Sequence, residues 1–177
     1  FITPEVADLR LEDRLSRTLV LGNRRHRFAD FAALVSRFVT PEDFHRAAQA
    51  IKDGDRRGLQ FEEEWDFLLQ EWGRRLGEAG VRDIASTFGG KDPGHCYKQA
   101  LYGWAQSDPD AAVKWINEYP NLPEAEAVTV AVLRGIALKS VETGTAAALA
   151  SLPADERGLR CLCPSCAQGV QPVHNER

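Results

Sequence analysis

Residues 101–115 read LYGWAQSDPDAAVKW, in which large apolar and small residues recur at helical spacing on both sides of Asp108 and Pro109. A short acidic side chain caps a helix by accepting hydrogen bonds from its free N–H groups, and proline suits the first helical position. The stretch therefore predicts the end of one helix, a tight turn and the start of a second helix.

The residue classes of this stretch recur upstream and downstream at a spacing of 32 positions. The aligned sets are Leu69, Leu101 and Leu133; Trp72, Trp104 and Ile136; Gly73, Ala105 and Ala137; Ala79, Ala111 and Thr143; and Ile84, Ile116 and Ala148. One helical hairpin cannot bury its apolar face alone, so copies stack into a solenoid. We therefore predict an all-α protein built as a short α-solenoid of helical hairpins with a period of about 32 residues. Chance matches within an ordinary helical bundle are the alternative.

The central copy carries the motif G-W-A-x-x-D-P-x-A-A-x-x-W, whose defined positions are Gly103, Trp104, Ala105, Asp108, Pro109, Ala111, Ala112 and Trp115. This motif resembles the repeat unit of a group of uncharacterised bacterial helical-repeat proteins of the tetratricopeptide-like type, over roughly residues 38–153. The resemblance implies a right-handed stack of hairpins that serves as an interaction module, and it implies no catalytic residue. The third copy departs from the motif at Ile136 and at Ser140-Val141, as expected of a terminal unit.

Composition places the chain among globular proteins, and the distribution of motifs divides it into three regions. It has 177 residues, of which 44% are hydrophobic and 27% are charged, close to the globular average. We expect residues 1–58 to form an irregular helical N-terminal cap and residues 59–153 to form the helical repeats. Residues 154–177 are expected to form a flexible, cysteine-containing tail, because proline and glycine interrupt a terminal segment.

Capping signals and apolar periodicity predict about eight or nine helices and no sheet. Separate helices are expected at residues 59–76 and 81–88, with a turn at the intervening glycines. Separate helices are also expected at residues 124–139 and 143–152. The first of these two is rich in alanine and valine, so we expect it to be well buried.

The net charge of −4 argues against general nucleic-acid binding, which needs a basic face. No apolar run approaches the roughly 18–20 residues that a membrane span requires. The chain begins at Phe1 without the basic-then-apolar pattern of a signal peptide. We therefore expect a protein or peptide partner, no nucleic acid, no membrane span within this chain and a cytoplasmic location, with an upstream signal or anchor left open.

Cys161, Cys163, Cys166 and His174 form the one pattern with metal-ligand character. Three thiolates and an imidazole match the ligand set of a tetrahedral zinc ion, so zinc is the cofactor that the sequence suggests. The C-x-C-x-x-C spacing differs from the usual pair of C-x-x-C knuckles, and a flexible tail with incidental cysteines is the alternative. Cys163 and Cys166 also offer a redox pair, although no strand-to-helix context accompanies them.

Two runs of like charge stand near expected helix starts. Glutamates occupy positions 62–64 and Asp66 follows, whereas arginines occupy positions 24, 25 and 27 around His26. Consecutive residues on a helix point in different directions, so the carboxylates do not converge on one cation or acid–base site. We expect a solvated helix start for the acidic run and a solvated interhelical turn for the basic run, with a phosphate or acidic partner as the alternative for the latter.

The remaining reactive residues do not form a catalytic set. His95 and Cys96 are adjacent, and adjacent helical positions diverge, so a nucleophile with its base is not supported. The four tryptophans, Trp65, Trp72, Trp104 and Trp115, are expected to fill the core between helices rather than a ligand cage.

We interpret the chain as a non-catalytic protein- or peptide-binding scaffold and not as an enzyme. A solenoid displays an extended inner surface that holds an extended or helical segment. Tyr97, Lys98 and Tyr102 flank the apolar core positions of the central repeat and are the candidate contact residues. The alternative is a metal- or redox-linked regulatory protein that uses the C-terminal cysteine cluster.

Overall fold

A computed structural model describes residues 4–55, 58–88 and 92–151, and describes side chains within 11–55, 58–88 and 92–143. All regular structure in these residues is helical, which confirms the all-α prediction. The helices are α1 (Pro4–Leu19), α2 (Arg24–Val35), α3 (Pro41–Asp55), α4 (Glu62–Phe88), α5 (Pro93–Ser107), α6 (Pro109–Glu118) and α7 (Ala125–Ser151).

The helix starts follow the capping chemistry of the sequence. Asp92 accepts a hydrogen bond from the backbone N–H of His95, and Asp108 accepts one from the backbone N–H of Ala111. In both cases the next residue is proline, whose missing N–H costs nothing at the first helical position. The predicted end-turn-start arrangement around Asp108 is therefore confirmed.

The seven helices are fewer than the eight or nine expected, because two expected boundaries lie inside continuous elements. In α4 the expected break is present as a kink at Gly77, whose backbone is not helical. Its φ of 57° and ψ of −133° form a conformation that glycine can adopt because it has no Cβ atom. In α7 the break expected between residues 139 and 143 is absent, and the helix runs through. Neither proline nor glycine occupies positions 140–143, so nothing in the backbone chemistry ends the helix there.

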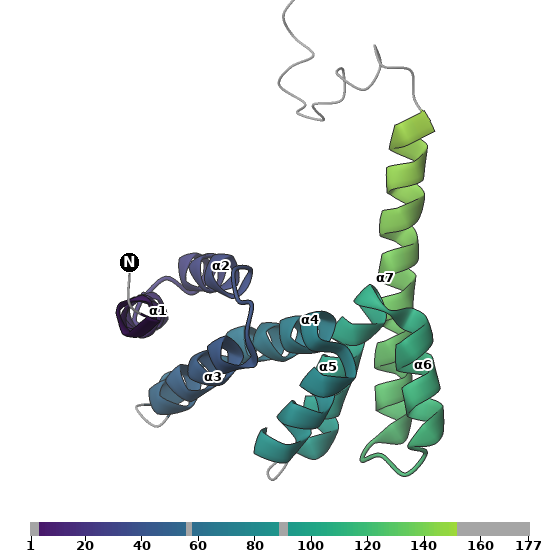
Figure 1. Cartoon of the computed structure of the whole chain (residues 1–177), viewed down its shortest axis with the longest axis horizontal. Helices are drawn as coiled ribbons and strands as arrows, with labels where there is room; N and C mark the ends of the chain where they lie inside the picture. Colours follow the sequence, from purple (N-terminus) through teal and green to yellow (C-terminus); the bar gives the residue numbers. More distant parts are fainter. Residues whose placement is uncertain (1–3, 56–57, 89–91, 152–177) are drawn as a thin grey trace, which may run out of the picture. The chain divides into compact units, whose positions relative to one another are not determined.

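The chain divides into two compact units, residues 1–139 and residues 140–177. In the first unit, helices that are close in sequence pack side by side: α1 on α2 and α3, α2 and α3 on α4, and α4 on α5 (Figure 1). The α6 helix packs on α5 and also contacts α4. The described part of the second unit is the C-terminal stretch of α7, residues 140–151.

Aromatic side chains fill the core of the first unit. Trp72 is fully buried, and its ring stacks on that of Phe44 with centroids 5.3 Å apart. Trp104 and Trp115 are also buried and meet edge-to-face at 6.2 Å, while Trp65 is partly buried against the same cluster. The prediction that the tryptophans form inter-helix core is confirmed.

Glycines set the closest approach between α4 and α5. A Cβ atom built on Gly73 would lie 1.9 Å from the carbonyl oxygen of Ala100, far inside any tolerated contact. On the neighbouring α7, a Cβ atom built on Gly135 would lie 2.5 Å from the carbonyl oxygen of Tyr102. The α5 helix therefore sits in backbone contact with a helix on each side.

The expectation that residues 124–139 are well buried is wrong for one face of α7. Val128 and Val132 are buried, but Leu133 is 58% exposed and Val130 is 41% exposed. The buried face is the one that meets α5 near Gly135. On the opposite face the apolar side chains of Val130, Leu133 and Leu138 are exposed to solvent.

Candidate binding surface

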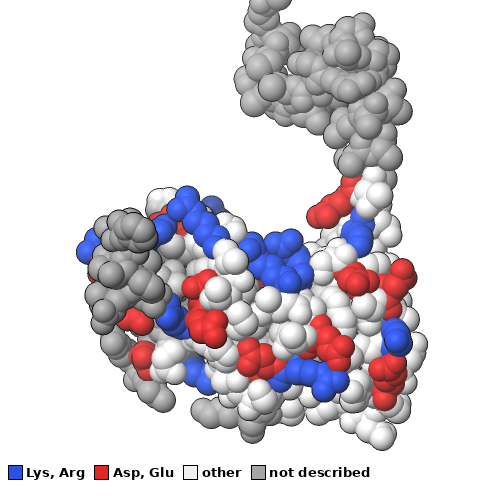
Figure 2. All heavy atoms as spheres, in the orientation of Figure 1, with Lys and Arg blue, Asp and Glu red and all other residues white. Residues whose placement is uncertain are grey.

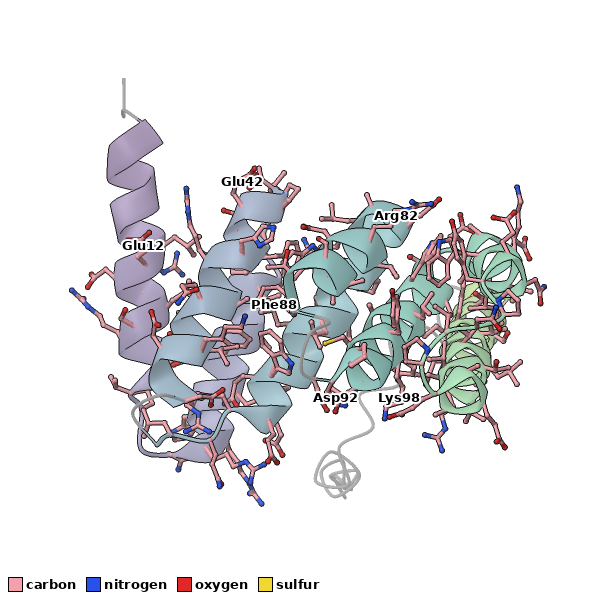
Figure 3. The ribbon with its side chains drawn as sticks, turned by 90° about the horizontal axis from the view of Figure 1, so that it is seen from below. Glu12, Glu42, Arg82, Phe88, Asp92 and Lys98 are labelled. Carbon is pink, nitrogen blue, oxygen red and sulfur yellow. The ribbon has the colours of Figure 1, made fainter. Side chains whose placement is uncertain are left out.

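Five side chains form the outward face of α5, which we name the α5 surface: His95, Lys98, Gln99, Tyr102 and Gln106. Each is partly exposed, whereas the opposite side of the helix is buried from Gly94 to Ala105. Helical spacing places them within one stripe, because residues three and four apart share a face. Lys98 projects outward from this stripe (Figure 3).

A hydrogen-bonded network holds one edge of the α5 surface against α4. The His95 Nε2 atom lies 2.6 Å from Asp66 Oδ1, and Gln99 Nε2 donates to Asp66 Oδ2 at 3.1 Å. Gln99 Oε1 in turn accepts from Gln70 Nε2 at 2.8 Å. Because each member is held by a neighbour on the other helix, the network fixes these polar groups in position at the surface.

The structure brings together two of the three predicted contact residues. Lys98 and Tyr102 share the α5 surface, since they are four residues apart. Tyr97 instead turns toward α6, where its ring centroid lies 6.1 Å from that of Trp115 and packs against the core. Tyr97 therefore packs beneath the α5 surface and is not part of it.

Lys98 also lines a shallow, open groove of about 620 Å³ between α5 and the start of α7. The other lining residues are Glu124, Ala125, Glu126, Ala127, Val130 and Arg134. Within the described part of the chain, neither Lys98 nor Arg134 forms an ion pair. Both signs of charge are interspersed over the face of the molecule seen in Figure 2. The groove thus offers two cations, two carboxylates and an apolar strip.

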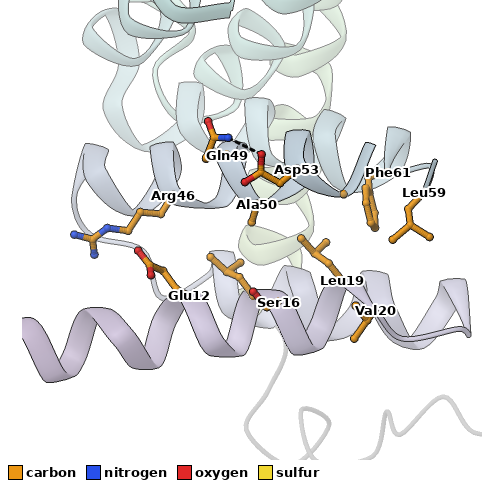
Figure 4. A pocket seen from close by; sticks show the side chains of 12 residues that line it. Glu12, Ser16, Leu19, Val20, Arg46, Gln49, Ala50, Asp53, Leu59 and Phe61 are labelled. Carbon is orange, nitrogen blue, oxygen red and sulfur yellow. Dashed lines mark hydrogen bonds between the residues drawn. The ribbon is translucent and has the colours of Figure 1, made fainter. Parts of the chain in front are cut away.

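A second cleft, of about 390 Å³, lies between α1 and α3 (Figure 4). Its apolar floor includes Leu15, Leu19 and Phe61, all buried. Gly54 admits the Phe61 ring, since a Cβ atom there would lie 2.2 Å from the ring. On the rim, Gln49 donates to Asp53 at 2.9 Å. Sequence reasoning missed this cleft, because its residues come from three separate segments and share no local pattern.

The two charged runs pair with each other, which corrects the expectation that both are solvated. The basic run forms the first turn of α2, and Arg27 Nε lies 2.7 Å from the Oε1 atom of Glu64. The Glu64 side chain is only 1% exposed, and Arg27 also stands over the Phe61 ring. Arg24 and Glu63 form a second, exposed pair. The opposite signs of the runs were the sequence signal for this contact between α2 and α4.

Cys96 and the ring of His95 lie on different sides of α5, as adjacent helical positions require. His95 bonds Asp66 at the surface, whereas Cys96 is buried and 5% exposed. Burial, followed by the nearby Asp92 carboxylate, raises the pKa of the Cys96 thiol. A raised pKa is the opposite of what a nucleophilic cysteine needs, because only the thiolate reacts.

The predicted zinc ligands Cys161, Cys163, Cys166 and His174 lie outside the described residues, so the zinc site and the redox pair stay predictions. Among the residues that are described, no cluster of three or more His, Cys, Asp or Glu is placed to hold a metal ion. The same part of the chain contains no helix long and apolar enough to cross a membrane.

Comparison with known proteins adds no family to these observations. No protein-family model, no curated protein sequence and no solved structure matches the chain.

Proposed function

We propose that the chain is a non-catalytic scaffold that binds a protein or peptide on the α5 surface, and that its helices form a short array of helical hairpins. One relation between contacts supports the array. Gly103 meets the carbonyl oxygen of Gln70, and Gly135 meets that of Tyr102. Both members of the second contact lie 32 positions after those of the first, which is the period of the sequence pattern.

The observation that carries the binding proposal is the groove beside Lys98. Its two cations lack internal ion-pair partners within the described chain, and its apolar strip includes Val130, which is 41% exposed. Partly exposed amide and phenol groups on α5 add hydrogen-bonding capacity next to it. Polar groups of both signs around an apolar strip suit an extended peptide that presents backbone amides and mixed side chains.

The positions of the potentially reactive side chains Asp66, His95 and Cys96 support the proposal of a non-catalytic role. The Asp66 carboxylate hydrogen bonds to both His95 and Gln99. Among the described residues, no serine, threonine or cysteine side chain hydrogen bonds to Asp66 or His95. Cys96 is buried with a raised pKa. The groups that acid–base or covalent chemistry needs are therefore present but not assembled.

Selection from a random peptide library displayed on phage tests the proposal. Peptides enriched on the purified chain would be synthesised, and their dissociation constants measured by fluorescence polarisation. We expect Lys98→Glu to raise the dissociation constant by about tenfold or more, because it reverses one of two groove cations. Lys114→Glu on α6 is the matched control, since this lysine is exposed and lies outside the groove.

Two results contradict the proposal. One is that no peptide is enriched over an unrelated helical protein of similar charge. The other is that enriched peptides bind the wild type, Lys98→Glu and Lys114→Glu chains equally well, which would place the binding elsewhere.

A further inference from the structure

The exposed face of α7 carries a stripe of three apolar residues that follow a glutamate. Glu126, Val130, Leu133 and Ala137 follow one another at spacings of four, three and four residues, so they share one side of the helix. All four are solvent-exposed, and Leu133 is 58% exposed. The residues at the repeat-equivalent positions of Leu133, which are Leu69 and Leu101, are fully buried. Exposed Leu133 and Val130 lie together on this face, and a contiguous apolar patch of this kind is typical of a protein-interaction surface.

The charged residues along this stripe are complementary to those of a second, antiparallel copy of α7. Glu126 lies four residues before Val130 and Arg134 lies four residues after it. Both are exposed, and neither forms an ion pair within the described residues. If two α7 helices pack antiparallel with Val130 at the crossing point, Glu126 of each copy faces Arg134 of the other. Two identical ion pairs then flank the centre, as a two-fold axis requires.

Side-chain sizes fit the same register. With Val130 opposite Val130 of the second copy, Leu133 faces Ala127 of that copy. A large side chain thus meets a small one on both sides of the crossing point, which is how facing helices interdigitate. Shape and charge therefore select the same antiparallel alignment.

From these relations we propose that α7 forms a dimer with α7 of a second copy of this chain, antiparallel and centred on Val130. This inference rests on the proposed function, because the α7 residues that line the groove also belong to the stripe, and the second copy of the chain is one protein partner for them. Lys98, Gln99 and Tyr102 belong to α5 and lie outside the stripe.

Sedimentation equilibrium of the full chain over a range of concentrations tests the dimer. We expect a reversible monomer–dimer equilibrium in which E126R or R134E alone raises the dissociation constant by about tenfold or more, because like charges then face each other twice. The double variant E126R/R134E restores both pairs and should dimerise within about threefold of the wild type. An equimolar mixture of the two single variants should form the heterodimer, in which both pairs are again opposite in sign.

All substituted side chains are exposed, so the variants should fold, and circular dichroism checks this. Lys114→Glu is the control for a change of surface charge outside the stripe. A chain that stays monomeric at every concentration overturns the proposal and leaves the stripe to another occupant. A dimer that is equally stable in V130D, E126R and R134E overturns the assigned face. Because Glu126, Val130 and Arg134 also line the groove, peptide binding is measured separately, on the wild-type and Lys98→Glu chains at concentrations at which both are monomeric.

Discussion

Gly103 on α5 lies directly against the main-chain carbonyl of Gln70 on α4, and a Cβ atom at position 103 would stand 1.9 Å from that oxygen. Gly73 on α4 makes the reciprocal contact with the carbonyl oxygen of Ala100. This close approach is what lets Gln70 and Gln99 hydrogen bond across the two helices. Two small residues inside the core thereby position the polar network on the surface above them.

Gly103→Ala should therefore destabilise the protein, although alanine normally favours a helix. The clash is with backbone atoms, so the helices must separate, and overpacking of this kind costs about 1–3 kcal/mol. Urea denaturation followed by circular dichroism measures the loss. Gly22→Ala is the control, because nothing lies within 4 Å of a Cβ atom there. Equal stability of Gly103→Ala and the wild type would show that α4 and α5 are not held this closely.

Arg27→Met should cost far more stability than Arg24→Met, although both remove an arginine–glutamate pair between α2 and α4. The Arg27–Glu64 side chains are 12% and 1% exposed, whereas the Arg24–Glu63 side chains are 64% and 53% exposed. Loss of Arg27 leaves a buried carboxylate without its counter-charge, which costs about 3 kcal/mol. An exposed pair contributes less than about 1 kcal/mol because water and salt screen it.

Chemical denaturation of the two variants, with Glu64→Gln to complete a double-mutant cycle, provides the measurement. Similar losses for Arg27→Met and Arg24→Met would contradict the burial of the Glu64 pair. A loss for Arg27→Met that Glu64→Gln does not reduce would mean that Arg27 acts through its packing on Phe61 or its hydrogen bond to the carbonyl oxygen of Gln60, and not through the charge of Glu64.

Local chemistry explains which parts of the fold the sequence could predict. Asp92 and Asp108 cap helices because each is followed by proline and by a helical pattern, and these features lie within a few residues. Trp104 and Trp115 could be assigned to the core from apolar periodicity alone. The break predicted after residue 139 had no helix-ending residue at positions 140–143 behind it, and it is absent.

Features that depend on distant segments were not predictable in the same way. Arg27 and Glu64 are 37 positions apart, and the opposite signs of the two charged runs do not by themselves say that α2 packs on α4. The exposure of Leu133 depends on what packs beyond α7, and its own sequence context looks as apolar as that of buried Leu101. Residue type and helical phase were enough to place Lys98 and Tyr102 on one partly exposed face of α5, and whether they bind a partner stays a prediction. That the Tyr97 ring lies against Trp115 could not be predicted without knowing where α6 packs.

Glu71→Gln should lower stability in a pH-dependent way. Burial alone would raise the pKa of Glu71, but hydrogen bonds from Arg74 at 2.6 Å and Arg75 at 3.1 Å outweigh it, so this pKa lies below its ordinary value of 4.5. A lowered pKa in the folded state stabilises the protein above the unfolded value, and this contribution is lost as pH falls through the folded value.

The difference in unfolding free energy between the wild type and Glu71→Gln should therefore be largest at neutral pH, on the order of 1 kcal/mol. It should shrink as the pH is lowered past the ordinary glutamate range. Urea denaturation at a series of pH values measures it. A difference that stays constant down to acidic pH would show that the charge of Glu71 does not contribute, and that only its shape matters.

Cys96 should resist alkylation in the folded protein, and this separates a scaffold from a thiol enzyme. Its side chain is 5% exposed, and burial raises its pKa, so both access and thiolate formation are suppressed. Reaction then requires unfolding, and a stability of about 5 kcal/mol would slow it by about a thousandfold or more. Iodoacetamide labelling at neutral pH, with mass spectrometry of the peptide that contains Cys96, gives the rate.

The same cysteine in urea-unfolded chain is the internal reference, since sequence and neighbours are unchanged. Gly103→Ala provides a second comparison, because a less stable protein exposes Cys96 more often, and its labelling rate should rise about fivefold for each kcal/mol of lost stability. Labelling of native Cys96 at the rate of the unfolded chain would mean an accessible, ionised thiol beside His95. That result would favour covalent chemistry at α5 over the binding role proposed for its surface.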